Sequence, residues 1–241
     1  NTLGLETTAL GFVAGFTGKA IEDGLAAQGI HTDFIHLPEG NSRINVKVKH
    51  GDETEINGQG PVITEEAINE LFAKLDTLTK EDILVLAGSI PNTLPEDIYE
   101  KILASLESKG IRVVVDATKD LLLNVLKYHP FLIKPNNHEL GEMFGIVCKT
   151  DEDIVHYAKK LQEKGAVNVL ISMAGDGAIL ITEDGQNIKM GTPKGKVVNS
   201  VGAGDSMVAG FITGYIRGGN YEEALKSGTA AGSATAFSEG L

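Results

Sequence analysis

The sequence predicts an α/β protein built around a mostly parallel sheet, and three observations support this class. Short runs of Val, Leu and Ile alternate with amphipathic segments over residues 83–172. Each run is apolar throughout, which is typical of strands covered on both faces. Each run also ends in polar or small residues, and ligands of parallel sheets bind at the carboxyl ends of the strands.

Four parallel strands separated by helices are expected in this region. The strands are expected at Leu84–Ala87, Arg112–Asp116, Phe131–Lys134 and Val167–Ser172. A helix is expected from about Pro91 to Lys109, because Thr93 and Glu96 have the spacing of a capping box. Further helices are expected up to Lys127, near Glu139–Phe144 and over Asp151–Lys164. The last two helices are expected to follow a glycine-rich turn, over the apolar run Met207–Ile212 and over Tyr221–Phe237.

Two antiparallel hairpins interrupt this alternation. The first covers Asn41–Asn57 and turns at His50–Asp52, and the second pairs Ile179–Thr182 with Asn187–Met190 at a sheet edge. Strand alternation in the first hairpin places polar Arg43, Asn45, Lys47 and Lys49 on one face and Ser42, Ile44, Val46 and Val48 on the other. The basic face is either a solvated edge or a lid over an anionic substrate. The apolar face would then pack on another surface, such as a second subunit.

Composition and charge limit the class of function. A chain of 241 residues can form one large domain, or one domain with a small appendage. Its net charge of −12 argues against a nucleic-acid partner. The single cysteine excludes an internal disulfide framework, and the absence of a secretory signal or membrane-length apolar run predicts a cytoplasmic protein without a membrane partner. A phosphate ligand would need a locally basic site, since distant charges are screened within about 8 Å.

The stretch Asn199–Ser206 combines a glycine-rich turn with Asp205 at the start of a helix. Free N–H groups at a helix start form an anion site, and an aspartate there could accept a proton from a hydroxyl that attacks a phosphoryl group. The alternative is a turn with an aspartate that caps the helix. The segments Gly15–Ala20 and Gly191–Lys196 lack the spacing of a phosphate-binding P-loop, and no dinucleotide or zinc motif is present.

Four motifs in order resemble those of the PfkB (ribokinase-like) carbohydrate kinases. They are Gly88–Pro91, Lys134–Leu140, Ser172–Ala178 (with Ala174 where glycine is usual) and Asn199–Ser206. The resemblance covers nearly the whole chain and implies a three-layer ribokinase-like fold with a small β lid. It places the kinase domain at residues 1–31 and 62–241 and the lid at residues 32–61. It also implies ATP and Mg²⁺ as cofactors and a homodimer formed through the lid.

The resemblance implies roles on the nucleotide side of the site. Asp205 would be the general base, and the N–H groups of Gly202, Ala203 and Gly204 would hold the charge of the transferred phosphoryl group. Glu139 would help to place Mg²⁺ through water. The nucleotide would be bound by Lys134, Asn136, Ser172, Gly175 and Gly177. Structural alternatives remain, because Glu139 could be only a first-turn helix acid and Lys134 a strand-end cation.

On the sugar side, the resemblance implies substrate contacts from Arg43, Asn45, Lys47 and Ser89. A planar guanidinium matches the oxygens of a phosphate, whereas Lys47 could be an edge charge and Ser89 a turn hydroxyl. The string Arg43–Lys47 is similar to that of the family's fructose 1-phosphate kinases. A kinase for tagatose 6-phosphate, and a nucleotide- or sugar-phosphate-binding protein without turnover, are the alternatives.

One departure from the family concerns the ends of the sequence. Family members begin with a strand, a substrate-binding aspartate and a G-G-K-G-x-N-x-A stretch, and Asn1–Leu5 resembles the segment just after it. We therefore expect one strand, several substrate contacts and the last helix to lie outside these residues, which leaves open whether this chain turns over.

Overall fold

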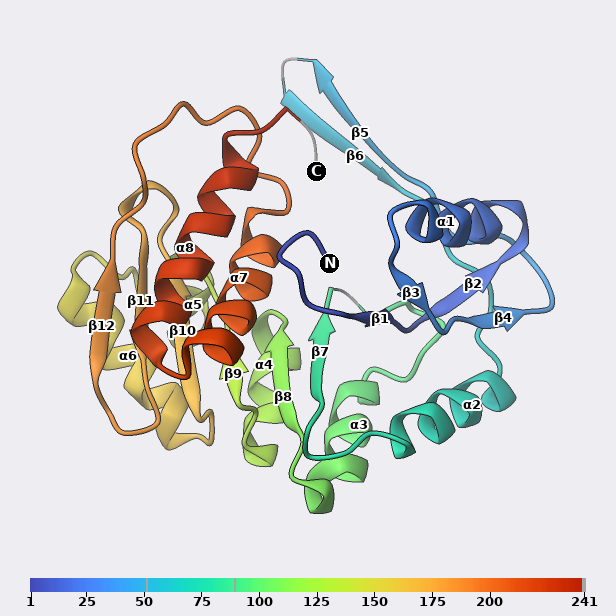
Figure 1. Ribbon diagram of the computed structural model, residues 1–241, viewed down its shortest axis with the longest axis horizontal. Helices are drawn as coiled ribbons and strands as arrows, with labels where there is room; N and C mark the ends of the chain where they lie inside the picture. Colours follow the sequence, from blue (N-terminus) through green and yellow to red (C-terminus); the bar gives the residue numbers. More distant parts are fainter. Residues whose placement is uncertain (51, 89, 240–241) are drawn as a thin grey trace. The chain divides into compact units, whose positions relative to one another are not determined.

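The computed structural model describes residues 1–50, 52–88 and 90–239. They form two compact units, of which unit 1 is Asn1–Leu78 with Ile90–Ile98 and unit 2 is Thr79–Ser89 with Tyr99–Leu241 (Figure 1). The separate lid domain over residues 32–61 stays a prediction. Within the described residues, no helix is long and apolar enough to cross a bilayer.

Unit 2 contains a six-stranded sheet with the order β12-β11-β10-β9-β8-β7. The strands are β7 (Ile83–Ala87), β8 (Arg112–Asp116), β9 (Leu132–Ile133), β10 (Asn168–Ser172), β11 (Ala178–Ile181) and β12 (Asn187–Met190). The pairs from β7 to β10 are parallel, and β11 and β12 add an antiparallel hairpin at the edge. The mostly parallel sheet and the second hairpin predicted from the sequence are confirmed.

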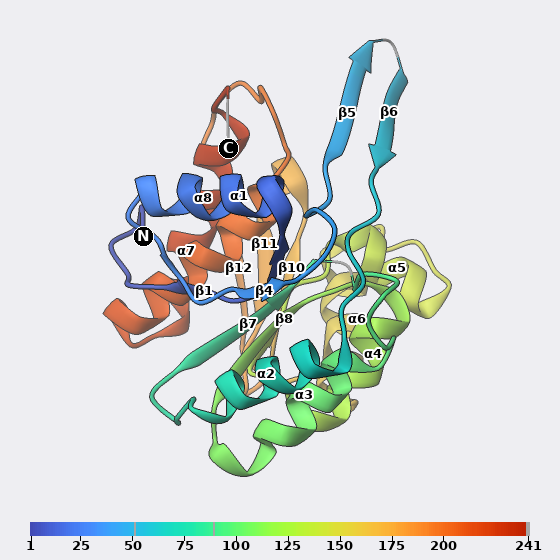
Figure 2. The same cartoon turned by 90° about the vertical axis from the view of Figure 1, so that its right-hand side faces the viewer.

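Helices cover both faces of this sheet. One face carries α7 (Ala203–Gly218) and α8 (Tyr221–Ala236), and the other carries α5 (Asn137–Phe144) and α6 (Asp151–Glu163), as Figures 1 and 2 show. The remaining helices of this region are α3 (Ile98–Leu106) and α4 (Lys119–Val125). Phe211 of α7 is fully buried against Leu132 and Leu170 of the sheet, so the unbroken apolar strands supply the core between the layers.

Glycines let α7 and α8 approach closely. A Cβ on Gly210 would lie 2.5 Å from the backbone oxygen of Ser227, and one on Gly228 would lie 2.8 Å from that of Met207. Distances this short leave no room for a side chain, so α7 lies backbone to backbone on α8. This packing fixes the start of α7.

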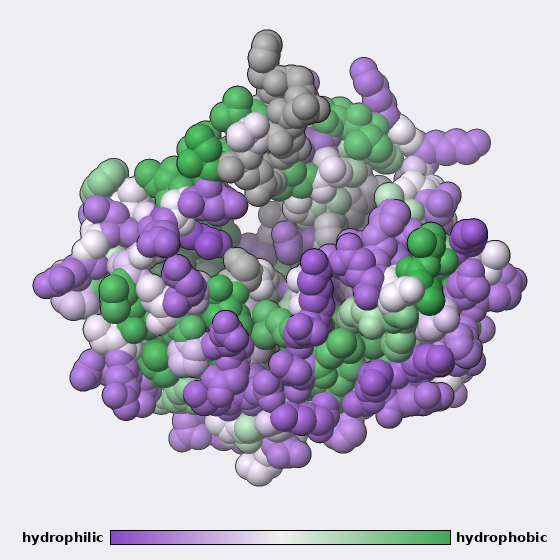
Figure 3. Space-filling model, turned by 180° about the vertical axis from the view of Figure 1, so that it is seen from behind, coloured by the Kyte–Doolittle hydropathy of each residue, from purple (hydrophilic) through white to green (hydrophobic). Residues whose placement is uncertain are grey.

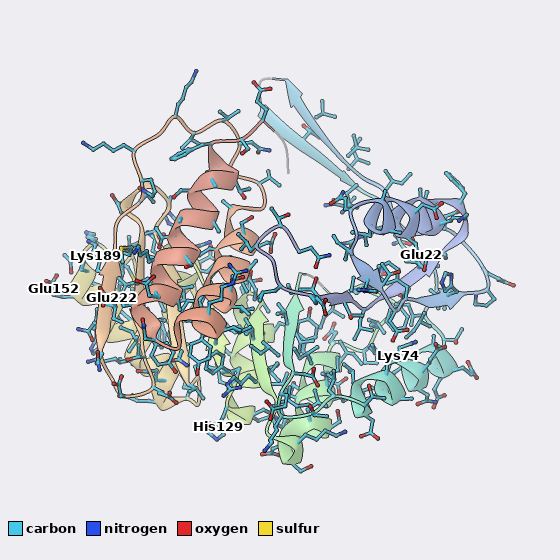
Figure 4. The ribbon with its side chains drawn as sticks, in the orientation of Figure 1. Glu22, Lys74, His129, Glu152, Lys189 and Glu222 are labelled. Carbon is cyan, nitrogen blue, oxygen red and sulfur yellow. The ribbon has the colours of Figure 1, made fainter. Side chains whose placement is uncertain are left out.

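Unit 1 combines short parallel strands, two helices and the first hairpin. Its elements are β1 (Thr8–Ala9), β2 (Phe12–Ala14), α1 (Gly15–Ala27), β3 (His31–Thr32), β4 (Ile35–Leu37), β5 (Asn45–His50), β6 (Asp52–Asn57) and α2 (Glu65–Asp76). The pairs β1–β3 and β2–β4 are parallel, and β5–β6 is antiparallel with His50 opposite Asp52, as predicted for the hairpin. Lys74 of α2 forms an ion pair with Asp33 at 2.6 Å (Figure 4).

The predicted start of the helix at Pro91 is wrong. Helix α3 begins at Ile98, and Thr93 donates its hydroxyl hydrogen bond to the backbone oxygen of Pro61 at 3.3 Å instead of capping a helix. Leu94 precedes Pro95, and a residue before proline is disfavoured in the helical region. The segment therefore remains a turn until it has passed the second proline.

Candidate active site

The α7 turn, Gly202–Asp205, leaves a helix start open. Gly202 is the N-cap residue with φ of 76°, a left-handed conformation that favours glycine, and it provides no side-chain cap. The first-turn N–H groups of a helix lack intrahelical partners, and the helix dipole adds positive potential there. The N–H of Ala203 donates to the backbone oxygen of Ser200 at 3.2 Å, so the N–H groups of Gly204 and Asp205 are the ones left for an anion at this turn.

The loop before this turn is anchored on the end of α8. The N–H groups of Val198 and Asn199 both donate to the backbone oxygen of Ala236, at 2.8 and 3.2 Å. The side-chain oxygen of Asn199 accepts from the N–H of Val201 at 3.2 Å. These bonds hold the chain that leads into Gly202, so the α7 turn is fixed from both of its sides.

Lys134 brings a positive charge under the α7 turn. It follows β9 and is only 7% exposed, and its Nζ lies 3.3 Å from Oδ1 of Asp116. A Cβ on Gly204 would lie 3.0 Å from the same Nζ. Glycine at position 204 thus leaves room for the buried ammonium directly beside the open N–H groups.

Three carboxylates act on one another around this ammonium. Burial raises the pKa of Asp116, Lys134 opposes the rise, and the negative charges of Asp205 and Glu139 add to it. Asp205 itself is exposed to solvent, in contrast to Asp116 and Lys134. The cluster therefore combines an exposed carboxylate, which could accept a proton, with a buried ammonium that partly compensates the negative charges around it.

Asn136 and Glu139 form a capping box at the start of α5. Oδ1 of Asn136 accepts from the N–H of Glu139, and Oε2 of Glu139 accepts from the N–H of Asn136, each at 2.8 Å. Glu139 therefore has the structural role that was left open from the sequence. Since the box involves one carboxylate oxygen, the other can still face a ligand. Asn136 also pairs with Ser172 in an isolated parallel bridge, which joins the two motifs.

The loop after β10 makes a tight turn over residues 173–177. The N–H of Met173 donates to the backbone oxygen of Gly177 at 2.8 Å, and a Cβ on Gly177 would collide with the oxygen of Met190. Thr192 donates a hydrogen bond to the oxygen of Gly175 at 2.8 Å. Ala174 has φ of 47°, so it holds a left-handed conformation at the position where the resemblance leads one to expect glycine.

Three of the four predicted sugar-side residues, Arg43, Asn45 and Lys47, belong to unit 1. Arg43 and Asn45 lie in unit 1 and are exposed, and Arg43 forms no ion pair with any described side chain. The side chain of Lys47 and the whole of Ser89 lie outside the described residues. The structure thus brings together Asp205, Gly204, Lys134 and Glu139 within unit 2.

Asp116 is the charged residue of this site to which sequence reasoning gave no role. Its signal was present, because a polar residue ends the apolar strand Val113–Val115 at the carboxyl edge of the sheet. What the sequence could not supply is its neighbour, since Lys134 is distant in the chain and meets Asp116 only through the β8–β9 pairing.

Comparison with known proteins gives consistent relatives. The pfkB family carbohydrate kinase profile matches residues 1–241. The 1-phosphofructokinase of Bacillus subtilis is 52% identical over 97% of this chain and 76% of its own length. The D-tagatose-1-phosphate kinase of Bacillus licheniformis is 40% identical over 99% of this chain and 78% of its own length. A Staphylococcus aureus structure assigned as a phosphofructokinase has a TM-score of 0.91 at 46% identity and covers 100% of this chain and 78% of that one.

These matches agree with the fold and with the motifs. The ribokinase-like architecture predicted from the sequence is confirmed, and the activity is that of a phosphotransferase with an alcohol acceptor on a sugar phosphate. The chain belongs to the pfkB family of carbohydrate kinases.

Proposed function

We propose that this chain carries the site that transfers the γ-phosphoryl group of ATP to the 6-hydroxyl of fructose 1-phosphate. The observation that supports this most is the α7 turn, where uncapped helix N–H groups, the buried ammonium of Lys134 and the exposed carboxylate of Asp205 occur together. An exposed carboxylate beside an anion site repels phosphate, so a site that only binds phosphate would gain nothing from it. A site that transfers a phosphoryl group to a hydroxyl would gain, because the carboxylate can accept the hydroxyl proton.

In the proposed reaction Asp205 accepts the proton of the sugar hydroxyl. The hydroxyl oxygen forms a bond to the γ-phosphorus, the bond from that phosphorus to the bridging oxygen breaks, and ADP leaves with the electron pair. The N–H groups of Gly202, Ala203 and Gly204 would stabilise the charge on the transferred group. A positioned general base of this kind contributes roughly 10²–10⁴-fold.

ATP and Mg²⁺ are the proposed cofactors. Among the described residues, no group of three or more His, Cys, Asp or Glu side chains is arranged to hold a metal ion. Mg²⁺ keeps much of its water and commonly binds through one or two carboxylates together with substrate phosphates. Glu139 would hold it through water, and the ion would neutralise charge on the phosphates. The nucleotide would contact Lys134, Asn136, Ser172, Gly175 and Gly177.

Arg43, Asn45, Lys47 and Ser89 are the proposed contacts of the sugar phosphate. Arg43 is exposed and has no ion pair with a described carboxylate, so its guanidinium is available to an anion. The proposed lid, residues 32–61, carries three of these four residues. A tagatose phosphate is a second candidate acceptor, because one relative at 40% identity is a D-tagatose-1-phosphate kinase.

The apolar side of the hairpin supports a homodimer formed through the lid. Ile44 and Ile56 are each 60% exposed and Val46 is 46% exposed, and Figure 3 shows hydrophobic residues along this hairpin. Val46 and Ile56 are opposite each other in the β5–β6 register, so they form one continuous apolar strip. Sedimentation at micromolar concentration should give a dimer, and a monomer alone would contradict this part of the proposal.

The test is ADP release with Mg-ATP and fructose 1-phosphate, fructose 6-phosphate, tagatose 1-phosphate or tagatose 6-phosphate. The highest kcat/KM for fructose 1-phosphate would support the proposal. A preference for a tagatose phosphate would replace the acceptor and keep the mechanism. Binding of Mg-ATP without turnover of any of the four acceptors would favour the non-catalytic alternative.

A further inference from the structure

Four hydrogen bonds hold the segment before Arg43 against the start of α1. Oδ1 of Asn41 accepts from the N–H of Phe16 at 3.2 Å, and Oγ of Ser42 accepts from the N–H of Ala14 at 3.0 Å. The N–H of Ser42 donates to the oxygen of Ala14 at 2.9 Å, and the hydroxyl of Thr17 donates to the oxygen of Ser42 at 2.8 Å. Every polar group of Ser42 therefore has a partner in the β2–α1 connection.

The β2–α1 connection has little space beyond what these two residues occupy. A Cβ on Gly15 would collide with the side chain of Asn41, and one on Gly18 would lie 3.1 Å from Oγ of Ser42. Ser42 is only 9% exposed, although the residues on either side of it are exposed. A buried, closely packed serine in an otherwise exposed segment indicates that Ser42 anchors this segment to the start of α1.

The anchor fixes the position of the main chain at Arg43. Arg43 follows Ser42 directly, and on its other side the oxygen of Ile44 accepts from the N–H of Gly58 at 3.1 Å. The main chain is thus bonded on both sides of Arg43, whereas its guanidinium pairs with no described carboxylate. A cation on a fixed main chain loses less freedom when it binds an anion, which raises affinity without any new contact.

We propose that Ser42 and Thr17 are positioning residues that hold Arg43 ready for the phosphate of the acceptor sugar. This inference rests on the proposed contact between Arg43 and that phosphate. It goes further in assigning acceptor affinity to two hydroxyl groups that need not touch the substrate.

The test compares Thr17→Val and Ser42→Ala with the wild type in the ADP-release assay. Thr17→Val keeps the shape of the side chain and removes one hydrogen bond, so it remains informative if Ser42→Ala, which leaves a buried N–H unpaired, fails to fold. We expect the KM for fructose 1-phosphate to rise roughly three- to tenfold, with kcat and the KM for ATP unchanged. Thr229→Val is the matched control, because it removes a hydroxyl bond to Leu225 of 2.9 Å inside α8. It should leave both KM values unchanged.

Arg43→Ala separates the two levels of the proposal. If Arg43→Ala raises the KM for fructose 1-phosphate and adding Thr17→Val to it raises KM no further, the hydroxyls act through Arg43. If Arg43→Ala raises KM but Thr17→Val and Ser42→Ala do not, positioning is overturned and the phosphate contact stands. An equal effect of Thr17→Val with and without Arg43 also overturns positioning. If Arg43→Ala leaves KM unchanged, the phosphate contact itself is wrong and the positioning proposal falls with it.

Discussion

Helices α1 and α7 both start at or next to a glycine with positive φ, but the N–H groups of their first turns have different surroundings. Gly15, with φ of 58°, is the first residue of α1, and Gly202, with φ of 76°, is the N-cap residue of α7. Neither N-cap residue, Ala14 or Gly202, provides a side-chain cap. At α1, however, the side chain of Asn41 accepts from the N–H of Phe16 at 3.2 Å. At α7 the turn is left open, with Lys134 beneath it and Asp205 in its first turn.

The difference shows what a glycine-rich helix start does and does not imply. Both helix starts are rich in glycine, but only Gly202–Asp205 was expected from the sequence to bind an anion, since Gly15–Ala20 lacks the spacing of a phosphate-binding loop. At α7 no side chain caps the helix start, although the N–H of Ala203 donates to the backbone oxygen of Ser200 at 3.2 Å. At α1 a side chain from elsewhere in the chain, Asn41, takes one of the N–H groups that an anion would need.

The largest effect should come from Asp205→Asn at the α7 turn. It removes the proposed base and keeps the size of the side chain, so kcat should fall by roughly 10²–10⁴. Asp205 is exposed, so the melting temperature should change little. Asp120→Asn, the same change in the first turn of α4, is the matched control and should leave kcat unaltered. Full activity of Asp205→Asn would exclude the base role.

Gly204→Ala should reduce the rate less than the loss of the base. The new Cβ would lie 3.0 Å from Nζ of Lys134, and this flexible side chain can move away, so the fold should survive. The ammonium would leave the open N–H groups, and kcat should fall about ten- to a hundredfold, less than removal of a whole charge-stabilising donor can cost. Gly24→Ala in α1 is the control, since its Cβ would meet nothing within 4 Å. It should stabilise the fold by about 1 kcal/mol without changing kcat. A fully active Gly204→Ala would show that the position of the ammonium is unimportant.

Asn41→Ala should open the start of α1 and cost stability. Loss of a helix cap typically costs about 1 kcal/mol, which denaturant unfolding can measure. If α1 then bound inorganic phosphate in calorimetry, the side-chain acceptor alone would distinguish the two helix starts. If no stability were lost, Asn41 would not be acting as a cap.

The smallest effect is a pH dependence at Asp116. Its pKa is raised above 3.8, so the folded chain binds this proton more tightly than the unfolded chain. The stability from Asp116 is present below the usual pKa and is lost as pH rises through the raised value. Relative to Asp116→Asn, the wild type should therefore lose stability from about pH 3.8 upward, as followed by urea midpoints.

Asp153→Asn provides the opposite case for the same measurement. Hydrogen bonds from the N–H groups of Lys149 and Thr150 lower the pKa of Asp153 below 3.8. Relative to this variant, the wild type should gain stability as pH rises toward 3.8. If the stability difference between wild type and variant changed with pH in the same direction in both comparisons, the description of the charges around Asp116 would be wrong.

The parts of the fold with a periodic pattern could be predicted from the sequence. The strand at Arg112–Asp116 and the hairpin that turns at His50–Asp52 match the structure, because apolar runs and alternation are local signals. The strands of residues 8–37 are only two or three residues long, too short to show a period. The helix start at Ile98 differs from the predicted one because the spacing of Thr93 and Glu96 resembles a capping box, whereas Pro95 between them disfavours helix at Leu94.

The candidate site was predictable where one motif carries its own chemistry. The α7 turn and the pair Asn136 and Glu139 are local in sequence and could be found by spacing. The contact of Asp116 with Lys134 depends on strand pairing, and the anchoring of Ser42 depends on a turn about 25 residues away, so neither could be predicted without the fold.

Ala174 shows what a left-handed alanine costs in the loop after β10. Its left-handed conformation, with φ of 47°, costs an alanine about 1–2 kcal/mol. Glycine would remove that cost, but it would also give the unfolded chain about 0.4–1 kcal/mol of additional freedom. The second effect offsets only about half of the first, so Ala174→Gly should stabilise the fold by roughly 0.5–1 kcal/mol. A pattern that demands glycine at this position would overlook chains, such as this one, in which alanine takes the same conformation.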